Sequence, residues 1–405
     1  MAKRKQQENS SGLLDIVVDI GNSLWKVMIQ GRPSTACVFP HSIKYISERK
    51  FASEGKRFEK GYQELHDIDF GTFAYRYKVK GGWDTAYVSA GSTAENKETE
   101  GIKVGAEKYI RQYYGVALTY LLLQMFPDGC DNPIRLTVGH PASDIEYRDA
   151  MIDSVIGNHF VKLLNGEKIK FVIKSVIPYE EGVAAGRNFV YTRDGIHYRQ
   201  MSQQFNEGLG LDINIGGGIS SVTPYSPQTG WVDYGNSTSI GSGINDIMKS
   251  IGSDILQEYA QSFTDNKDGN LALDARMRMT VKTGKYWQNG YNLDVAHIVK
   301  DSTRVFRNNL RTAIITAGGV GRFRFITISG GGGGYMWKSL MDNDTLNFNP
   351  DFIFPALDSD GVVKEDLEHM MLEEMHYSVL FGADKTTSAK IYKISQESKP
   401  KRRRR

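Results

Sequence analysis

The sequence contains Asp15-Ile16-Val17-Val18-Asp19-Ile20-Gly21-Asn22-Ser23-Leu24-Trp25-Lys26-Val27, in which a β-forming run meets an acid, a small-residue turn and a second β-forming run. The same design returns in Leu211-Asp212-Ile213-Asn214-Ile215-Gly216-Gly217-Gly218-Ile219-Ser220-Ser221-Val222. Each stretch predicts a β-hairpin whose turn can hold phosphate oxygens on backbone N–H groups. The pair predicts two related domains that hold one nucleotide. The aligned positions are Asp19 with Asn214, Gly21 with Gly216, and Val27 with Val222.

The length and composition are those of a globular protein with two domains. A chain of 405 residues exceeds what one ordinary core supports. The longest apolar run, Val116–Phe126, is too short to span a bilayer, and residues 1–12 lack the apolar segment of a signal peptide. Cys37 and Cys130 provide neither a disulfide framework nor a metal-binding set. We therefore expect a cytoplasmic protein without a transmembrane segment.

Basic side chains are concentrated at the C-terminal end. Residues 399–405 contain six of them, so the rest of the chain has a formal charge of −3 against +3 for the whole. A mildly acidic body does not favour DNA binding over its whole surface. The tail 399–405 has three interpretations: a solvated end, a contact with DNA, or a contact with an acidic adaptor or a membrane surface.

Composition divides the chain into six parts. We expect a flexible basic arm (1–12), a first domain (13–187), a polar linker (188–208), a second domain (209–350), a closing segment with a helix (351–393), and a basic tail (394–405).

Alternating strand and helix patterns predict α/β layers in both domains. Between Gln30 and Val104 we expect short strands (Phe70–Val79, Thr85–Ser89) and no helix. A continuously buried strand is predicted at Ile169–Ile177, and a strand at Arg324–Ser329 that runs into the five glycines Gly330–Gly334. The expected helices are Lys108–Phe126, Asp144–Asn158, Pro178–Gly186, Asn245–Tyr259, Asp294–Thr316 and Leu367–Phe381, the last ending at Gly382.

The first hairpin carries groups suited to a metal-bound nucleotide. Asp19 ends a buried strand, and a carboxylate there can hold Mg²⁺ together with its waters. The backbone N–H groups of the turn face phosphate, and Lys26 could reach the β- or γ-phosphate. An ordinary β-hairpin is the alternative. The turn residues are Gly21, Asn22, Ser23 and Leu24.

Two further glycine-rich stretches point to a ligand. Gly216, Gly217 and Gly218 let the backbone approach a ligand closely, and glycine otherwise weakens a hairpin. Gly330–Gly334 would allow the chain to turn under a flat ring or a phosphate; a flexible loop is the alternative. No P-loop pattern is present, because Gly284-Lys285 lacks both the upstream glycine and a following Ser or Thr. Phosphate binding must therefore come from the paired hairpins.

Hairpin, hairpin and glycine-rich loop, in this order, resemble the superfamily of actin, sugar kinases and heat-shock chaperone ATPases. Within it, the chain is most similar to the prokaryotic actin-like ATPases, the ParM-type plasmid-segregation and archaeal actin-like group. The motifs that carry the likeness include Asp19–Lys26, Thr137–Pro141, Ile177–Gly186, Ile240–Gly243, Ile326–Gly332 and His376–Gly382. The resemblance implies an α/β fold of two related actin-like (ribonuclease-H-like) domains with a nucleotide cleft between them. It also implies that the helix of the closing segment 351–393 returns to the first domain.

The resemblance also implies functional residues. Glu181 falls where the family orients the hydrolytic water, and Asp19 and Asp212 would complete the catalytic and metal-binding set, through water. ATP or ADP with Mg²⁺ is the implied cofactor. The nucleotide-binding residues implied are Gly21, Asn22, Ser23, Leu24, Lys26, Asn214, Gly216, Gly217, Gly218, Gly241, Ser242, Gly330, Gly331 and Gly332.

One position departs from the family pattern. The family usually has Asp where this chain has Asn214, and it helps there to hold the water shell of the metal. Asp212 lies on the same face of the strand, two residues further from the phosphates. The amide adds no negative charge, so the sequence predicts weaker Mg²⁺ binding or slow hydrolysis.

The leading hypothesis is an actin-like ATPase that binds Mg-ATP in the interdomain cleft and polymerises into dynamic filaments, for DNA or plasmid segregation or for intracellular positioning. Its partner would be the chain itself, with a DNA-bound or acidic adaptor at the tail 399–405. Two alternatives stay open: a sugar or small-acid kinase of the same superfamily, and a non-hydrolysing ATP-binding scaffold.

Overall fold

The computed structural model describes residues 12–59, 71–79, 81–94, 105–192, 195, 197, 205, 207–259, 271, 275–288, 290–341, 346–356 and 377–397. The chain forms two compact units. Unit 1 comprises residues 1–140 and 144–179, and unit 2 comprises residues 141–143 and 180–405. This division falls ahead of the predicted linker 188–208, so the predicted domain limits remain predictions. No helix among the described residues is long and apolar enough to cross a membrane.

Unit 1 is built on one nine-stranded sheet with the order β3-β2-β1-β7-β9-β8-β5-β6-β4. The first hairpin of the sequence is β1–β2, and β1 also pairs in parallel with β7. The strands are β1 Leu14–Ile20, β2 Leu24–Ile29, β3 Cys37–Pro40, β4 Ile43–Tyr45, β5 Thr72–Val79, β6 Gly82–Ala90, β7 Ile134–His140, β8 Gly157–Leu163 and β9 Lys168–Glu180.

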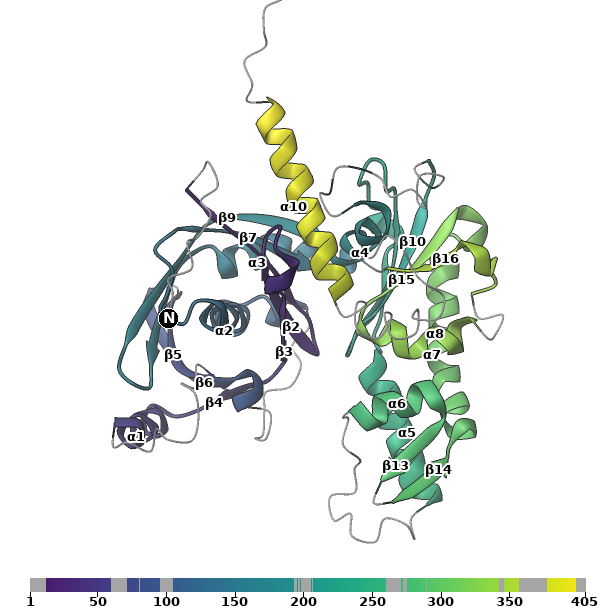
Figure 1. Cartoon of the computed structure of the whole chain (residues 1–405), viewed down its shortest axis with the longest axis horizontal. Coiled ribbons are helices and arrows are strands. Elements are labelled where there is room, and N and C mark those ends of the chain that lie inside the picture. The colour runs from purple at the N-terminus through teal and green to yellow at the C-terminus, as the bar shows by residue number, and fades with distance from the viewer. Residues whose placement is uncertain are drawn as a thin grey trace, which may run out of the picture. The chain divides into compact units, whose positions relative to one another are not determined.

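The sheet of unit 1 curls around helix α2 (Val116–Met125), which Figure 1 shows end-on inside the strands. Residues Val116–Leu123 are all buried, and a helix that is apolar on every side needs such an enclosed position. A π-helical turn, Arg111–Gly115, leads into α2. The predicted helix Lys108–Phe126 is therefore confirmed over its C-terminal half.

Two local predictions in unit 1 were wrong, and a third was confirmed only in part. Helix α1 (Glu48–Glu59) lies where no helix was predicted, because its sequence is mostly polar; Phe51 is its buried apolar residue among the side chains described. The predicted helix Asp144–Asn158 is a 3₁₀ segment followed by α3 (Arg148–Val155); the left-handed Gly157 then begins β8. Strand β9 is not continuously buried, since its first half alternates between exposed and buried residues.

Unit 2 contains a five-stranded sheet with the order β12-β11-β10-β15-β16. One face packs on α5, α7 and α8 through an apolar core that includes Ile213, Ile251 and Leu310. Helix α4 covers the other face, where its Gly182 and Gly186 lie against Thr223 and Tyr225 of β11. The sheet strands are β10 Gly210–Ile215, β11 Ser220–Tyr225, β12 Thr238–Ile240, β15 Phe325–Ser329 and β16 Ile353–Pro355.

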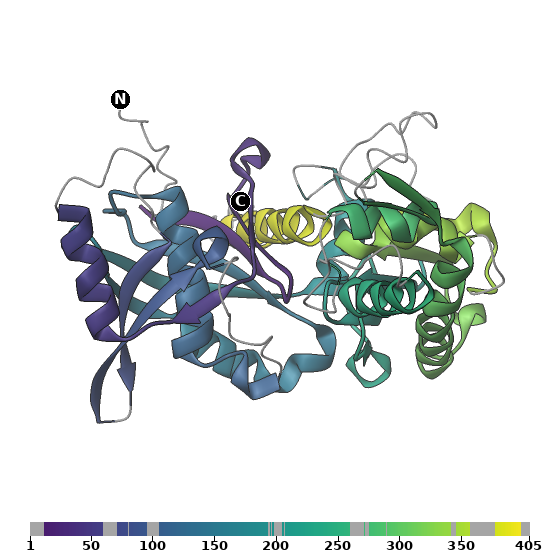
Figure 2. The same ribbon diagram turned by 90° about the horizontal axis from the view of Figure 1, so that it is seen from below.

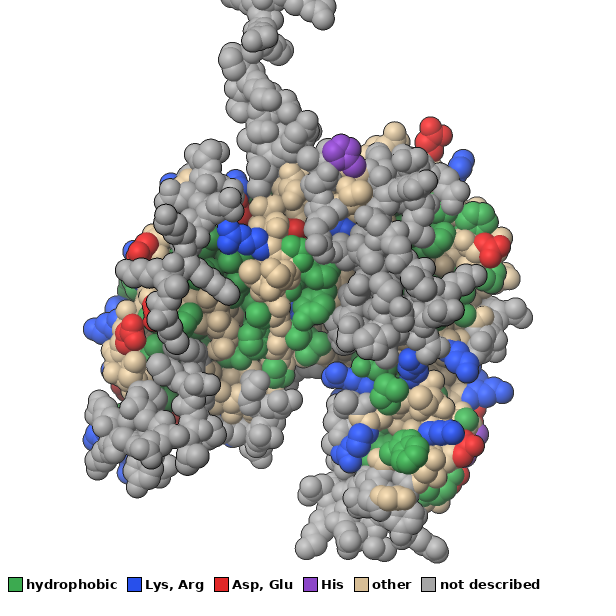
Figure 3. Space-filling model, in the orientation of Figure 1, with side chains coloured by type: hydrophobic (Ala, Val, Ile, Leu, Met, Phe, Trp, Pro, Cys, Tyr) green, Lys and Arg blue, Asp and Glu red, His purple; other side chains and the backbone are tan. Residues whose placement is uncertain are grey.

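The helices of unit 2 are α4 Glu181–Val190, α5 Ile244–Glu258, α6 Ala275–Thr283, α7 Ala296–Thr316, α8 Gly331–Met341 and α10 Ser378–Glu397. A two-stranded sheet, β13 Lys285–Gln288 with β14 Tyr291–Asp294, follows α6. Near it, the side chains of Met279 and Trp287 are exposed, and Figure 3 shows basic and apolar side chains together on this end of the unit.

The prediction that the last helix ends at Gly382 was wrong. Helix α10 continues through this residue and packs along α4, as Figures 1 and 2 show for the yellow helix. A Cβ at Gly382 would overlap the carbonyl oxygen of Ala184, so the glycine permits close helix contact rather than a helix end. Lys385 reinforces this contact, since its ammonium donates to the carbonyls of Asn188 and Tyr191 at 3.1 and 3.0 Å, at the C-terminus of α4. Residues 367–376 of the predicted helix lie outside the described residues.

The two sheets repeat one pattern, which confirms the predicted α/β fold of two related domains. The order β3-β2-β1-β7-β9 in unit 1 corresponds to β12-β11-β10-β15-β16 in unit 2. The central hairpins also agree in register, because Asp19 pairs with Lys26 and the aligned Asn214 pairs with Ser221. The internal likeness read from the sequence is therefore a likeness of backbone structure.

Candidate functional site

The turn of the first hairpin is a tight loop that requires glycine at its first position. Ile20 pairs with Trp25, so Gly21–Leu24 form the loop. A Cβ on Gly21 would lie 2.9 Å from the carbonyl oxygen of Leu24, which is closer than side chains tolerate. The loop residues are half-buried. The predicted residues of the first hairpin thus share one compact turn in unit 1.

Asp19 and Lys26 face each other across the first hairpin. The Lys26 ammonium donates to Oδ2 of Asp19 at 2.6 Å, and both side chains are buried. A buried ion pair of this kind is stable only while both partners are present, because a lone buried charge is costly. The structure therefore holds the predicted carboxylate and the predicted phosphate-binding lysine as one unit at the mouth of the turn.

His41 supports the same turn, and sequence analysis missed it. Its Nδ1 lies 2.8 Å from the Gly21 carbonyl, and its backbone N–H donates to Ser23 at 2.9 Å. Burial lowers the pKa of His41 to about 4, so the ring is neutral near neutral pH. Nδ1 then carries the proton that the Gly21 carbonyl accepts, and Nε2 accepts from the Tyr113 hydroxyl. No sequence signal links His41 to a turn 20 residues earlier, since only the fold brings them together.

The second hairpin has the same loop geometry in unit 2. Ile215 pairs with Ser220, and a Cβ on Gly216 would overlap the carbonyl oxygen of Ile219, to which the Gly216 N–H donates at 3.1 Å. In both hairpins, therefore, the first loop residue is a glycine that lies against the carbonyl oxygen of the fourth loop residue. Two loops of equal length and equal glycine requirement show that the same turn occurs in both units.

Helix α5 begins directly on this second loop. The N–H groups of Ile244 and Asn245 donate to the carbonyls of Gly216 and Gly217 at 3.0 and 2.9 Å. A Cβ on Gly243 would lie 2.5 Å from the Gly217 oxygen, which explains this glycine. The carbonyls of Gly216 and Gly217 therefore satisfy the first N–H groups of helix α5, which otherwise have no partner within the helix.

The five glycines do not form a free loop. Gly330 has a left-handed φ of 80° and is the turn itself, whereas Gly331–Gly334 form the first turn of α8. A Cβ on Gly330 would lie 2.6 Å from Oδ1 of Asn214, and one on Gly332 would lie 2.7 Å from Cγ2 of Ile215. The structure thus brings Gly330 and Gly332 against the second hairpin, as expected for parts of one site.

Gly241 differs from these glycines. It is exposed, no atom lies within 4 Å of its would-be Cβ, and its φ is not left-handed. Neither packing nor backbone conformation requires glycine here. A glycine at position 241 would be explained if a ligand approached the backbone closely there. This agrees with the predicted role of Gly241 and Ser242 in nucleotide binding.

Asn214 and Asp212 share one face of β10 but differ in surroundings. Asp212 is fully buried, and its two carboxylate oxygens accept from the hydroxyls of Thr327 at 2.7 Å and Ser329 at 2.9 Å. Burial raises the pKa of Asp212 to about 8. A carboxyl that is neutral near neutral pH is a poor Mg²⁺ ligand. The metal-binding role of Asp212 stays a prediction, and these surroundings favour a structural carboxyl below Asn214.

Glu181 is the first residue of α4 and is half-buried. It belongs to unit 2, whereas Asp19, Lys26 and the first turn belong to unit 1. In unit 2, Gly330 and Gly332 lie against Asn214 and Ile215 of the second hairpin. No group of three or more His, Cys, Asp or Glu side chains among the described residues is placed to hold a metal. The donor set therefore fits Mg²⁺ only as an ion that keeps its waters and is held largely by nucleotide phosphates.

Residues 17–183 match the sequence family described as the N-terminal domain of actin-like proteins. Solved structures extend the likeness to the whole chain. Actin-like protein Alp7A is 14% identical, with coverage of 95% of this chain and 98% of its own and a TM-score of 0.66. The chain has the actin-like fold. The predicted resemblance to prokaryotic actin-like proteins is thereby confirmed.

Two further structures share the actin-like fold of this chain. The archaeal actin homologue Ta0583 in complex with ADP is 13% identical, covers 93% of this chain and 100% of its own, and has a TM-score of 0.60. ParM in a 15-stranded filament from Clostridium botulinum is 13% identical, covers 93% and 99%, and has a TM-score of 0.60. No curated protein matches the actin-like chain in sequence.

Proposed function

We propose that this actin-like chain binds Mg-ATP with the hairpin loops of both units, polymerises in the bound state and hydrolyses the nucleotide. The observation that carries the proposal is the equivalence of the two loops, each with a glycine fixed against the carbonyl of the fourth loop residue. A repeated loop of this kind offers backbone N–H groups from two sides to one chain of phosphates. The ADP complex of Ta0583 supports nucleotide binding by analogy of fold.

In this proposal each residue has a defined task. The N–H groups of Gly21–Leu24, Gly217 and Gly218 bind phosphate oxygens, whereas the Gly216 N–H closes its own loop on Ile219. Lys26 adds a positive charge beside the phosphates. The Asp19 carboxylate, which holds Lys26 at 2.6 Å, also accepts hydrogen bonds from the waters of Mg²⁺. The ion neutralises phosphate charge when bound, and Glu181 orients the attacking water. Gly241, Ser242 and Gly330–Gly332 line the nucleoside part.

Asn214 sets the rate in this scheme. Its amide stands where the related proteins have a carboxylate, and its Oδ1 lies at the backbone of Gly330. It accepts a hydrogen bond from water without adding charge to the metal site. We therefore expect slow ATP hydrolysis. If the rate of hydrolysis is zero, the chain is a non-hydrolysing ATP-binding scaffold. Asn214→Asp separates these cases, since the added carboxylate raises the rate of phosphate release only if the chain hydrolyses ATP.

In this proposal the chain acts by assembling with copies of itself into filaments. ParM of Clostridium botulinum forms a filament, and this chain shares its fold. An exposed apolar surface is needed for such contacts, and Trp287 is 59% exposed at the end of unit 2 that carries β13. We propose that the filament moves or positions DNA, with the basic residues 399–405 in contact with DNA or with an acidic adaptor.

The catalytic part is tested by phosphate release. Glu181→Ala is expected to leave Mg-ATP affinity unchanged and to slow release by about 10²-fold or more, because an oriented water is lost. Glu180→Ala is the matched control at the neighbouring position, where the carboxylate accepts from Tyr234. Equal release rates in the two variants would remove Glu181 from its role.

A further inference from the structure

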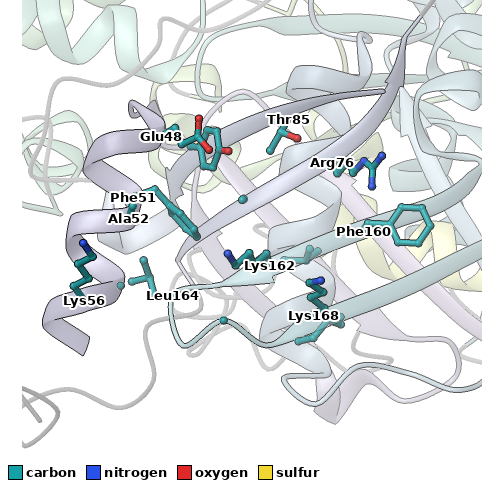
Figure 4. Close-up of a pocket in the computed structure, with 16 residues that line it drawn as sticks. Glu48, Phe51, Ala52, Lys56, Arg76, Thr85, Phe160, Lys162, Leu164 and Lys168 are labelled. Carbon is teal, nitrogen blue, oxygen red and sulfur yellow. The ribbon is translucent and has the colours of Figure 1, made fainter. Parts of the chain in front are cut away.

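Unit 1 contains a pocket of about 550 Å³ that takes no part in the hairpin site. It opens between helix α1 and the outer face of strands β5, β6, β8 and β9 (Figure 4). The inner face of the same strands packs on the core around α2, with Tyr75 and Val161 among its buried residues. The pocket is therefore a feature of the sheet surface and not a defect in the core.

A small residue creates the hollow. In the strand register, Lys168 pairs with Lys162, Lys162 with Ala74, and Ala74 with Tyr87, so that these four side chains form one row across the sheet. The side chain of Ala74 is much smaller than those of its neighbours in this row, so it leaves open space above the sheet. Phe51 of α1, whose ring lies 5.3 Å from that of Tyr87, closes one side of the hollow. The result is an apolar floor with aromatic walls.

Basic side chains surround this floor. Lys162 and Lys168 stand directly opposite each other on neighbouring strands, an arrangement that destabilises a sheet through charge repulsion. Arg76 and Lys56 add two further positive charges to the lining, and Figure 4 shows the four from α1, β5, β8 and β9. None of the four forms an ion pair with another described residue of the chain.

Among the described residues the lining contains one acidic side chain, Glu48, and it is hydrogen-bonded. The carboxylate of Glu48 accepts a hydrogen bond from the Tyr87 hydroxyl, whose pKa is raised first by burial and then by this contact. This hydrogen bond leaves the negative charge of Glu48 in place, so the described lining carries four positive charges against one negative charge. The pocket combines uncompensated positive charge with apolar surface.

We propose that this pocket binds a small organic anion with a ring-containing or short-chain apolar body. The apolar part fills the space above Ala74 between Phe51 and Phe160, and the anionic group pairs with Lys162 and Lys168. The volume lies within the range of small-molecule sites, and such sites combine apolar walls with a few convergent polar groups. Binding relieves the repulsion between the two lysines, which makes the anion a stabilising ligand of unit 1.

The test uses 8-anilinonaphthalene-1-sulfonate, whose aromatic body and single sulfonate match the proposed class. Titration of the full chain is expected to show one saturable site that weakens with added salt. Lys162→Gln with Lys168→Gln should weaken binding at least tenfold. Lys78→Gln with Lys174→Gln is the matched control, since these exposed lysines lie on β5 and β9 outside the pocket and should leave binding unchanged.

A second variant tests the hollow itself. Ala74→Leu adds apolar atoms to the floor, so it should abolish binding of the probe while the thermal midpoint stays the same or rises. Gly241→Val should leave probe binding unchanged, because it alters only the proposed nucleotide site. The proposal would be overturned if the probe still bound to both the Lys162→Gln, Lys168→Gln variant and the Ala74→Leu variant. It would also be overturned if the control variant Lys78→Gln, Lys174→Gln lost binding to the same extent as the pocket variants.

Discussion

Asp212 offers a direct test of how the interior of unit 2 is built. Burial raises the pKa of this carboxyl from 3.8 to about 8 despite hydrogen bonds from Thr327 and Ser329. The folded chain thus binds a proton that the unfolded chain has released. A group whose folded pKa lies above its unfolded pKa contributes stability at low pH that is lost as the pH rises to the folded value. The contribution of Asp212 to the stability of the chain should therefore fall from about pH 4 to about pH 8.

The magnitude follows from the shift. Each unit of pKa difference corresponds to about 1.4 kcal/mol, so the carboxyl costs about 4 kcal/mol more at pH 8 than at pH 5. Asp212→Asn removes the titration and keeps the shape, with the amide able to accept from one hydroxyl and donate to the other. The variant should gain about 4 kcal/mol over the wild type between these two pH values.

Urea unfolding without nucleotide, followed by circular dichroism at several pH values, measures this difference. Asp233→Asn is the control, because Asp233 is hydrogen-bonded to Asn236 and to Arg322, and its pKa is lowered. A lowered pKa contributes stability that is lost only as the pH falls through it, so the control should differ from the wild type by a constant amount over the same range. Parallel pH profiles for Asp212→Asn and the wild type would refute the burial argument.

Two further predictions concern glycines. Gly241→Val should leave the stability of the chain unchanged and weaken Mg-ATP binding at least about tenfold. Gly321→Val, at a second exposed glycine with open space around it, is the control and should change neither property. Equal Mg-ATP affinities of the two variants, measured by calorimetry, would contradict the role of Gly241. Gly382→Ala should destabilise the chain by about 3 kcal/mol or more, because its Cβ overlaps Ala184. Gly252→Ala, in the middle of α5, should instead stabilise the chain by up to about 1 kcal/mol, because the new Cβ would lie 3.4 Å from the flexible side chain of Met277. If thermal unfolding showed changes of the same sign for Gly382→Ala and Gly252→Ala, the contact of Gly382 with α4 would be contradicted.

The parts of the fold that the sequence predicted are those encoded locally. The sequence predicts the two hairpins from pairs of β-forming runs around small-residue turns. The structure adds the reason for the first glycine of each turn, which is the nearby carbonyl of Leu24 or Ile219. The amphipathic helix at Asp294–Thr316 was predicted because its apolar residues recur at helical spacing, and it is α7.

The parts that it missed depend on contacts between distant segments. Helix α1 is polar and gains its place through Phe51, and Gly382 marks a helix contact with Ala184 instead of a helix end. The support of the first turn by His41 also requires the folded chain. A glycine in the sequence signals that a side chain is excluded, but only the structure shows what excludes it.

The central claim, that nucleotide binding drives polymerisation, is tested most directly by sedimentation and electron microscopy of the purified full chain with Mg-ATP, with Mg-ADP and without nucleotide. The account predicts filaments that pellet with Mg-ATP and are fewer or absent in the other two conditions. A chain that binds Mg-ATP and yet remains in the supernatant at every accessible concentration would contradict it.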